Sequence, residues 1–258
     1  MFVTRPDARI KTFAFGGGPR TILAVGGWIG SGEVWLDTLG PLSARWRTIT
    51  YDHRGTGAST CGAQRLTVAD MVDDLFAVMD AHGVGRCVLA AESSGAGSAL
   101  EAVLRAPERF DGVVTVGGNW LRGRPGQHDA FIAALRADYP RAIAGFVDRC
   151  FPEPDSAEIR RWGRQILMRA SPEHAVQLLE NRDALSVEDR LGELRVPLLA
   201  LHGALDAIVP VEASRVLARG VAGARLVVFD DLGHVPVVSA PHRVVAEIDA
   251  FFGREAGA

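Results

Sequence analysis

The sequence predicts an α/β fold in which a mostly parallel sheet is covered by helices on both faces. Two observations carry this prediction. Short, continuously apolar runs alternate along the chain with longer stretches that have helical spacing, and this alternation is typical of strands buried in a parallel sheet. In addition, 48% of the 258 residues are hydrophobic, which is enough for a sizeable core.

The N-terminal region predicts two strands. Residues 8–15 alternate between apolar and polar side chains, and residues 21–25 form an apolar run. Between them, the Gly-Gly-Gly-Pro of residues 16–19 is a strong turn signal. The pattern therefore predicts a hairpin at the start of the chain.

A glycine-rich loop follows the second strand and leads into a stretch with helical spacing. Its sequence is Gly26-Gly27-Trp28-Ile29-Gly30-Ser31-Gly32. A loop of this kind can present backbone N–H groups to an anion, as an oxyanion hole does. The alternative is a plain tight turn. A phosphate-binding P-loop does not fit, because no lysine follows the glycines.

The next strand, residues 47–51, leads into a polar, glycine-punctuated loop over residues 52–59. This loop could position a substrate, but its residue types more often make a structural loop with satisfied hydrogen bonds, and we favour that interpretation. A capping-box pattern at Thr67 and Asp70 then predicts an amphipathic helix that packs on the sheet.

A second strand-to-helix turn contains two adjacent serines, Ser93 and Ser94, after an apolar run. A serine exposed on a sharp, strained turn leaves no room for a side chain two positions before or after it. For Ser93 these positions hold Ala91 and Gly95. For Ser94 one of them holds Glu92, which would collide with the incoming helix. We therefore assign Ser93 as a candidate nucleophile.

Two other interpretations of this turn remain open at this point. One of the serines could simply be the N-cap of the following helix. A dinucleotide-binding fingerprint is the other alternative, since Gly95 and Gly97 have its first spacing, but Leu100 occupies the place of its third small residue.

The alternation of strands and helices stops after a strand at residues 112–118. From 119 to 194 the sequence shows no convincing strand but four helical stretches, at residues 127–138, 140–150, 155–170 and 171–185. We interpret this segment as a helical lid inserted after the sixth strand. The expected organisation is thus an α/β core formed by residues 1–118 and 195–258, with a lid formed by residues 119–194.

Two further strand ends carry an acid and a histidine. Asp206 follows a strand at residues 196–203, and His234 follows the last strand, residues 224–229, before a closing helix at 241–252. The carboxyl ends of parallel strands meet at one edge of a sheet, so both side chains can reach Ser93 there. Their order along the chain, serine then acid then histidine, is the order used by nucleophile-elbow hydrolases.

These motifs together resemble the α/β-hydrolase superfamily over essentially the full length of the chain. Within it, the chain resembles small, lidded serine esterases and enol-lactonases. Two positions depart from the family pattern: Gly26 stands where a histidine is usual before the oxyanion glycine, and Ala91 replaces the usual first glycine of the serine turn. The resemblance is carried by residues 26–28, 51–59, 91–95, 203–210 and 231–236.

The resemblance implies a catalytic triad of Ser93, Asp206 and His234. It also implies an oxyanion hole formed by the backbone N–H groups of Trp28 and Ser94, and no metal or organic cofactor. The candidate pocket residues are Trp28, Ile29, Trp120, Phe146, Trp162 and Val235.

The expected function is hydrolysis of a small, rather apolar carboxylic ester or lactone through an acyl-enzyme. Two alternatives keep the same fold. The triad could instead cleave a carbon–carbon bond or pass the acyl group to an acceptor other than water. The chain could also be a ligand-binding signalling protein that retains a slow triad, because fold alone does not fix function.

The composition of the chain limits the kinds of molecule that it is expected to bind. The formal charge of −3 offers no basic surface for nucleic acid, and no apolar stretch is long enough to span a membrane. The three cysteines are too few and scattered for a disulfide framework or a metal site. We expect a cytoplasmic monomer or homodimer that acts on a small molecule.

Overall fold

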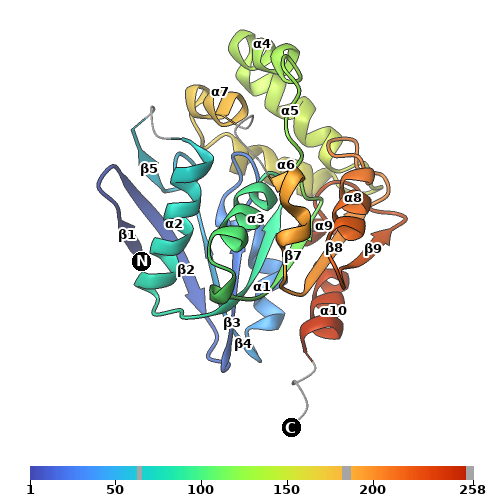
Figure 1. The fold of residues 1–258 in the computed structure, drawn as a ribbon. Coiled ribbons are helices and arrows are strands. Elements are labelled where there is room, and N and C mark those ends of the chain that lie inside the picture. The colour runs from blue at the N-terminus through green and yellow to red at the C-terminus, as the bar shows by residue number, and fades with distance from the viewer. Residues whose placement is uncertain (63–65, 182–186, 254–258) are drawn as a thin grey trace.

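The computed structural model describes residues 1–62, 66–181 and 187–253. Figure 1 shows a central sheet with helices on both sides and a further group of helices above one edge. The strands are β1 (Phe2–Thr4), β2 (Ala8–Phe15), β3 (Arg20–Val25), β4 (Trp46–Tyr51), β5 (Thr60–Cys61), β6 (Cys87–Glu92), β7 (Phe110–Val116), β8 (Leu198–Gly203) and β9 (Arg225–Phe229).

The strands form one sheet in the order β1-β2-β4-β3-β6-β7-β8-β9, with β5 paired to β2. All pairings from β4 to β9 along this order are parallel, and only those made by β2 are antiparallel. Strands β6 and β8 are buried along their whole length, as continuous apolar runs require. The predicted mostly parallel α/β sheet is therefore confirmed.

The predicted N-terminal hairpin is wrong. Strand β2 pairs antiparallel with β4, and β4 separates it from β3. The turn at residues 16–18 instead crosses the start of β4, where a Cβ atom on Gly18 would lie 1.9 Å from the Arg45 carbonyl oxygen. The apolar run of β3 explains this arrangement, because it is buried most completely between two parallel neighbours, β4 and β6.

Helices cover both faces of the sheet. In Figure 1, α2, α3 and α8 lie on one face, and α1 and α10 lie on the other. Each face has its own buried apolar cluster. None of the helices in the described part of the chain is both long and apolar enough to cross a membrane. The α-helices are α1 (Leu36–Leu42), α2 (Val68–Ala81), α3 (Gly95–Arg105), α4 (Asp129–Ala137), α5 (Tyr139–Cys150), α6 (Ala157–Leu167), α7 (Pro172–Glu180), α8 (Glu212–Gly220), α9 (Pro236–Ser239) and α10 (Pro241–Phe252).

Helices α4 to α7 form a helical insertion between β7 and β8, above the carboxyl edge of the sheet (Figure 1). It follows the seventh strand rather than the predicted sixth. The short strands β1 and β5, which pair with β2, were not predicted from the sequence. The four predicted helical stretches correspond to α4, α5, α6 and α7. The predicted end of the last stretch, at residue 185, lies outside the described residues, as do residues 254–258 of the predicted core.

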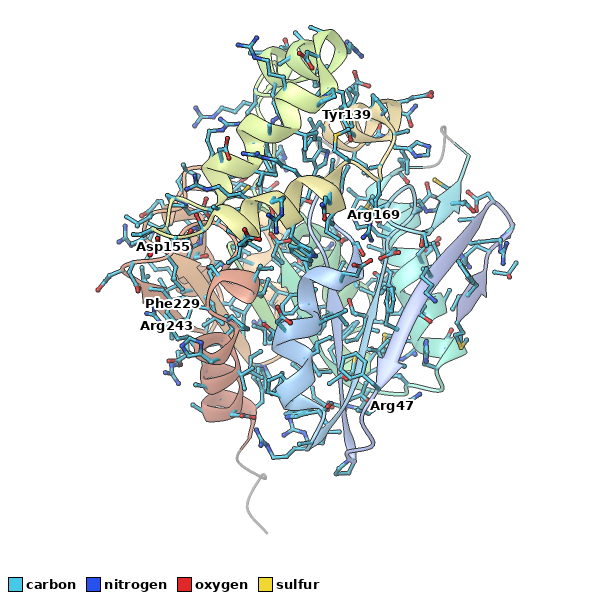
Figure 2. The ribbon with its side chains drawn as sticks, turned by 180° about the vertical axis from the view of Figure 1, so that it is seen from behind. Arg47, Tyr139, Asp155, Arg169, Phe229 and Arg243 are labelled. Atoms are coloured by element: carbon cyan, nitrogen blue, oxygen red, sulfur yellow. The ribbon has the colours of Figure 1, made fainter. Side chains whose placement is uncertain are left out.

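Polar contacts hold the insertion on the core. Figure 2 shows Arg169 at the junction between the insertion and the core, where its guanidinium pairs with Glu33. The indole Nε1 of Trp28 donates a hydrogen bond of 2.8 Å to the carbonyl oxygen of Ala175 in α7. Within the insertion, the Tyr139 hydroxyl donates to the Ala170 carbonyl oxygen at 3.1 Å.

The chain changes direction across the sheet between β3 and β6. From β3 it continues to β4 on one side, and later strands from β6 onwards extend on the other side. The loops after β3 and β6 therefore diverge at neighbouring strand ends, and a crevice at such a switch point is the usual ligand site of an open α/β sheet. This topology places the glycine-rich loop next to the serine turn.

Candidate active site

Ser93 lies on the turn between β6 and α3 with a backbone φ of 50°. Because this left-handed conformation is rare for residues with a side chain, the turn is strained, as the sequence predicted. A Cβ atom on Gly95 would lie 2.5 Å from the carbonyl oxygen of Gly26. The predicted lack of space two positions after Ser93 is thus confirmed.

The three candidate triad residues meet at this edge of the sheet. The Oγ atom of Ser93 lies 2.8 Å from Nε2 of His234. The other ring nitrogen of His234, Nδ1, lies 2.7 Å from Oδ2 of Asp206. Ser93 and His234 are 7% and 2% exposed. The three side chains therefore form one continuous, desolvated hydrogen-bonded chain.

Asp206 is held by four donors. Its Oδ1 accepts hydrogen bonds from the backbone N–H groups of Ile208 and Val209, both at 2.8 Å. Its Oδ2 faces His234 and also lies 3.2 Å from Nε2 of His202. Burial alone would raise the pKa of Asp206, but the hydrogen bonds from His202 and His234 outweigh it and lower the pKa. Asp206 is thus a fixed carboxylate.

The loop that carries His234 is anchored on both sides. The backbone N–H of His234 donates to the Cys150 carbonyl oxygen at 2.9 Å. On the outer side, the Arg243 guanidinium lies 4.7 Å from the centre of the Phe229 ring, and both residues are labelled in Figure 2. Burial lowers the pKa of His234, but the hydrogen bond and charge of Asp206 outweigh it, so the pKa is raised.

Two backbone N–H groups beside Ser93 are candidates for an oxyanion hole. Those of Trp28 and Ser94 have no hydrogen-bond partner among the residues that the structure describes. Trp28 directly follows Gly27, where an added Cβ atom would lie 2.8 Å from Cβ of Ser93. Ser94 directly precedes helix α3, and the partial positive charge of a helix N-terminus favours an anion there.

Glu92 is a site residue that the sequence reasoning missed. It is the last residue of β6 and is 6% exposed. Its Oε2 accepts a 2.8 Å hydrogen bond from the Gly27 N–H, and its Oε1 lies 3.7 Å from Nε2 of His234. Burial raises the pKa of Glu92 to about 7. The sequence feature that could have identified it is a single acidic residue at the end of an otherwise apolar strand, directly before the candidate nucleophile.

The raised pKa of Glu92 makes a prediction about stability. Its folded-state pKa of about 7 exceeds the ordinary value of 4.5, so the folded protein binds the proton more tightly. Stability due to protonated Glu92 is full below pH 4.5 and is lost as pH rises through 7. A Glu92→Gln variant keeps an oxygen that can accept the hydrogen bond from the Gly27 N–H, but its amide group does not titrate. As the pH rises through this window, the wild type should lose stability and the variant should not. We therefore expect the free energy of unfolding of the variant minus that of the wild type to increase by on the order of 3 kcal/mol.

Urea denaturation of both proteins at several pH values between 5 and 8 measures this difference. A difference that stays constant with pH would contradict the prediction. Glu101→Gln, on helix α3, serves as the matched control, because Glu101 is partly exposed and lies outside the site.

A small apolar cavity of about 60 Å³ opens beside Ser93 and His234, under helices α5 and α6. Five of the six predicted pocket residues line it, together with Glu92 and further apolar side chains of the insertion. A cavity that holds a single water needs about 10–15 Å³ of such space, so this volume fits a small group of several heavy atoms. The five predicted residues that line it are Trp28, Ile29, Phe146, Trp162 and Val235.

The sixth predicted pocket residue, Trp120, does not line this cavity. It is fully buried in the apolar cluster on the α2 and α3 face of the sheet. The chain turns at Gly117, which has a φ of 55°, and Trp120 packs into the core before the insertion begins. The prediction for Trp120 is corrected to a core residue.

Comparisons with known proteins agree with the α/β fold described above. A family model described as "alpha/beta hydrolase fold" matches residues 20–161, which is more than half of the chain. The protein named "Putative carbamate hydrolase RutD" of a Caulobacter species is 30% identical over 260 residues, covering 93% of this chain and 94% of that protein. The pimeloyl-acyl-carrier-protein methyl ester esterase of Nitrosomonas europaea is 29% identical and covers 94% of this chain and 99% of its own length.

Among solved structures, an esterase from Exiguobacterium antarcticum superposes with a TM-score of 0.91. The match covers 98% of this chain and 99% of the esterase, at 22% sequence identity. At this identity the similarity is evidence for the fold, which includes the helical insertion because nearly the whole chain is matched.

Proposed function

Since the chain belongs to the α/β-hydrolase fold family, as its motifs predicted, we propose that it is a serine-dependent hydrolase of small carboxylic esters or lactones. The observation that carries the proposal is the hydrogen-bonded chain from Ser93 through His234 to Asp206, with distances of 2.8 and 2.7 Å. The relatives support hydrolysis of a carbonyl compound, because their names describe ester and carbamate hydrolases.

The first half of the reaction forms an acyl-enzyme. Oγ of Ser93 attacks the carbonyl carbon while its proton passes to Nε2 of His234. Asp206 accepts the hydrogen bond from Nδ1, which keeps Nε2 free to take that proton and stabilises the imidazolium that forms. The imidazolium then gives the proton to the leaving oxygen as the bond from carbon to this oxygen breaks.

The second half hydrolyses the acyl-enzyme. His234 takes a proton from water as the water oxygen attacks the acyl carbon, and it returns the proton to Oγ of Ser93 as the carboxylic acid leaves. In both halves the negative oxygen of the tetrahedral intermediate would lie against the N–H groups of Trp28 and Ser94. The N-terminus of helix α3 adds a favourable dipole at the same place.

The cavity supports a short acyl group. Its volume of about 60 Å³ is far below the ~300–1,000 Å³ of pockets that enclose drug-sized ligands. Phe146 and Trp162 of the insertion are among the residues that line it. We therefore assign residues 119–194 the role of a lid over a core formed by residues 1–118 and 195–258. We also infer that the enzyme prefers acyl groups from acetyl to butyryl.

Labelling and turnover test the proposal together. A fluorophosphonate probe is expected to label the protein stoichiometrically, and hydrolysis of p-nitrophenyl esters should be fastest for two to four acyl carbons. Absence of labelling would contradict the serine hydrolase. Labelling without turnover on any ester would favour acyl transfer, carbon–carbon cleavage or a receptor instead.

Two adjacent glycines, Gly26 and Gly27, allow a test of the proposed oxyanion hole together with its control. A Cβ atom at position 27 would lie 2.6 Å from Oε2 of Glu92 and 2.8 Å from Cβ of Ser93, whereas one at position 26 would have its nearest neighbour, the Ser31 carbonyl oxygen, at 3.4 Å. We expect Gly27→Ala to lower kcat/KM by roughly 10²–10³-fold through displacement of the Trp28 N–H. Gly26→Ala should stay within a few-fold of the wild type, because its Cβ makes only ordinary contacts.

Steady-state kinetics on p-nitrophenyl acetate and thermal melts of both glycine variants check this expectation. Equal losses of activity in the two variants would show that the loop does not depend on the close approach at position 27.

A further inference from the structure

In the glycine-rich loop of residues 26–32, the carbonyl oxygen of Gly27 accepts two hydrogen bonds. Nε2 of His53 lies 2.9 Å from it, and the backbone N–H of Gly30 donates to it at 3.1 Å. The N–H of Gly27 itself donates to Glu92. Both polar groups of Gly27 are therefore held, although its neighbour Gly26 has no side chain that could brace the loop.

The proton on His53 can be placed from its partners. A carbonyl oxygen can only accept, so Nε2 must carry the hydrogen that points to Gly27. The other nitrogen, Nδ1, faces the Arg54 carbonyl oxygen at the longer distance of 3.3 Å. Burial lowers the pKa of His53, although the carbonyl oxygens of Gly27 and Arg54 oppose this shift. A neutral ring has one N–H, and the shorter contact of Nε2 with Gly27 places the proton on Nε2.

The segment that carries His53 is rigidly attached to the same loop. Oδ1 of Asp52 accepts hydrogen bonds from the Ser31 hydroxyl at 2.7 Å and from the Gly32 N–H at 2.8 Å. On the other side, the buried Arg54 guanidinium makes two hydrogen bonds of 2.7 Å to the carboxylate of Asp74. The imidazole of His53 is thus positioned by charged, buried contacts on both of its neighbours.

The geometry points to a specific role for this contact, which rests on the proposed function. The Gly27 C=O and the Trp28 N–H belong to one planar trans peptide and point in opposite directions. A donor that fixes the carbonyl also fixes the direction of the N–H, and it strengthens the N–H dipole by polarising the peptide. We propose that His53 is a positioning residue that aims and polarises the Trp28 N–H toward the oxyanion.

Two amide substitutions separate this role from simple packing. His53→Gln places an amide nitrogen near the position of Nε2 and can still donate to the Gly27 carbonyl. His53→Asn has the same functional group, but its nitrogen matches Nδ1 and does not reach that carbonyl. We expect the asparagine variant to lose roughly 10–100-fold in kcat with KM within twofold, since it misaims a donor without removing it. The glutamine variant should recover most of the loss.

A transition-state analogue gives the second measurement. An aryl trifluoromethyl ketone adds to a serine as a hemiketal oxyanion, so its inhibition constant should weaken in His53→Asn by the same factor as kcat. His82→Asn is the control, because His82 bonds to Thr12 away from the site, and both constants should stay at wild-type values. Thermal melts identify any variant that is not folded, and His53→Phe then replaces His53→Asn as the variant without a donor.

The outcomes are distinguishable. If the wild type is not labelled by the fluorophosphonate, the hydrolase proposal fails. If the wild type is labelled and active but His53→Asn retains its kcat and its ketone affinity, the role of His53 is overturned. Equal losses in the glutamine and asparagine variants would also overturn it, because they would show that the donor is not what matters.

Discussion

Replacing Ser93 by alanine is expected to lower ester turnover by at least ~10⁴-fold, while replacing the adjacent Ser94 leaves it within a few-fold of the wild type. The contrast follows from the structure. The Ser93 hydroxyl lies 2.8 Å from Nε2 of His234, whereas the Ser94 side chain makes no capping hydrogen bond to α3. Alanine at position 94 also keeps the backbone N–H that we assign to the oxyanion hole.

Active-site titration with the fluorophosphonate and kinetics on p-nitrophenyl acetate measure both variants. The Ser93→Ala protein should neither be labelled nor turn over, and its thermal midpoint should remain close to that of the wild type. The assignment of the nucleophile would fail if labelling followed Ser94 instead.

A loss of about 10⁴-fold in kcat is also expected for Asp206→Asn. The two backbone N–H groups of Ile208 and Val209 bind Oδ1 of Asp206, so in the variant the amide oxygen stays with them. The amide nitrogen then occupies the place of Oδ2 and donates to Nδ1 of His234. This hydrogen bond leaves the ring proton on Nε2, which can no longer accept the proton of Ser93.

Asp231→Asn is the control for this experiment, because Asp231 lies in the same loop as His234 but is exposed and pairs with Arg243. Exposed pairs of this kind contribute little, so this variant should keep its kcat. Retention of more than a few per cent of kcat by Asp206→Asn would argue against the role of Asp206 in selecting the histidine tautomer.

The sequence was sufficient to predict the strands of the sheet other than the short β1 and β5, and the gathering of Ser93, Asp206 and His234 at its carboxyl edge. Ser93, Asp206 and His234 each follow a strand of the parallel part of the sheet, and the geometry of such a sheet brings its strand ends together whatever the intervening chain does. The expected lack of space at position 95 was also correct, although the crowding atoms belong to Gly26 and Val25, which lie far away in the sequence. Their catalytic roles remain a proposal.

The pairing of β2 was not predictable in the same way. Adjacent strands in sequence usually pair, and the turn residues favoured a hairpin, but burial of β3 between two parallel strands decided the topology. Trp120 was placed wrongly for a related reason. A large apolar side chain at the edge of a predicted pocket fits equally well into the core, and only the turn at Gly117 decides between the two.

His53 and Glu92 were missed because their partners lie far away in the sequence. Their hydrogen bonds to Gly27 span 26 and 65 residues. The local pattern around His53 is that of a structural loop, and this interpretation is correct as far as Asp52 and Arg54 are concerned. The local sequence pattern does not reveal that His53, which lies between them, faces the loop that follows β3.

Trp28 ties the α/β core to the insertion, so neither part can be exchanged for that of another protein without regard to this residue. Its backbone belongs to the loop beside Ser93, but its ring packs against Phe131 at 5.3 Å and Phe146 at 5.2 Å, between ring centres, and its indole donates to α7. A chimaera that takes α4 to α7 from another protein would keep the active-site loop attached to a surface that no longer fits it. Residue 28 therefore has to be transplanted together with the helices, although more than 90 residues separate it from them in the chain.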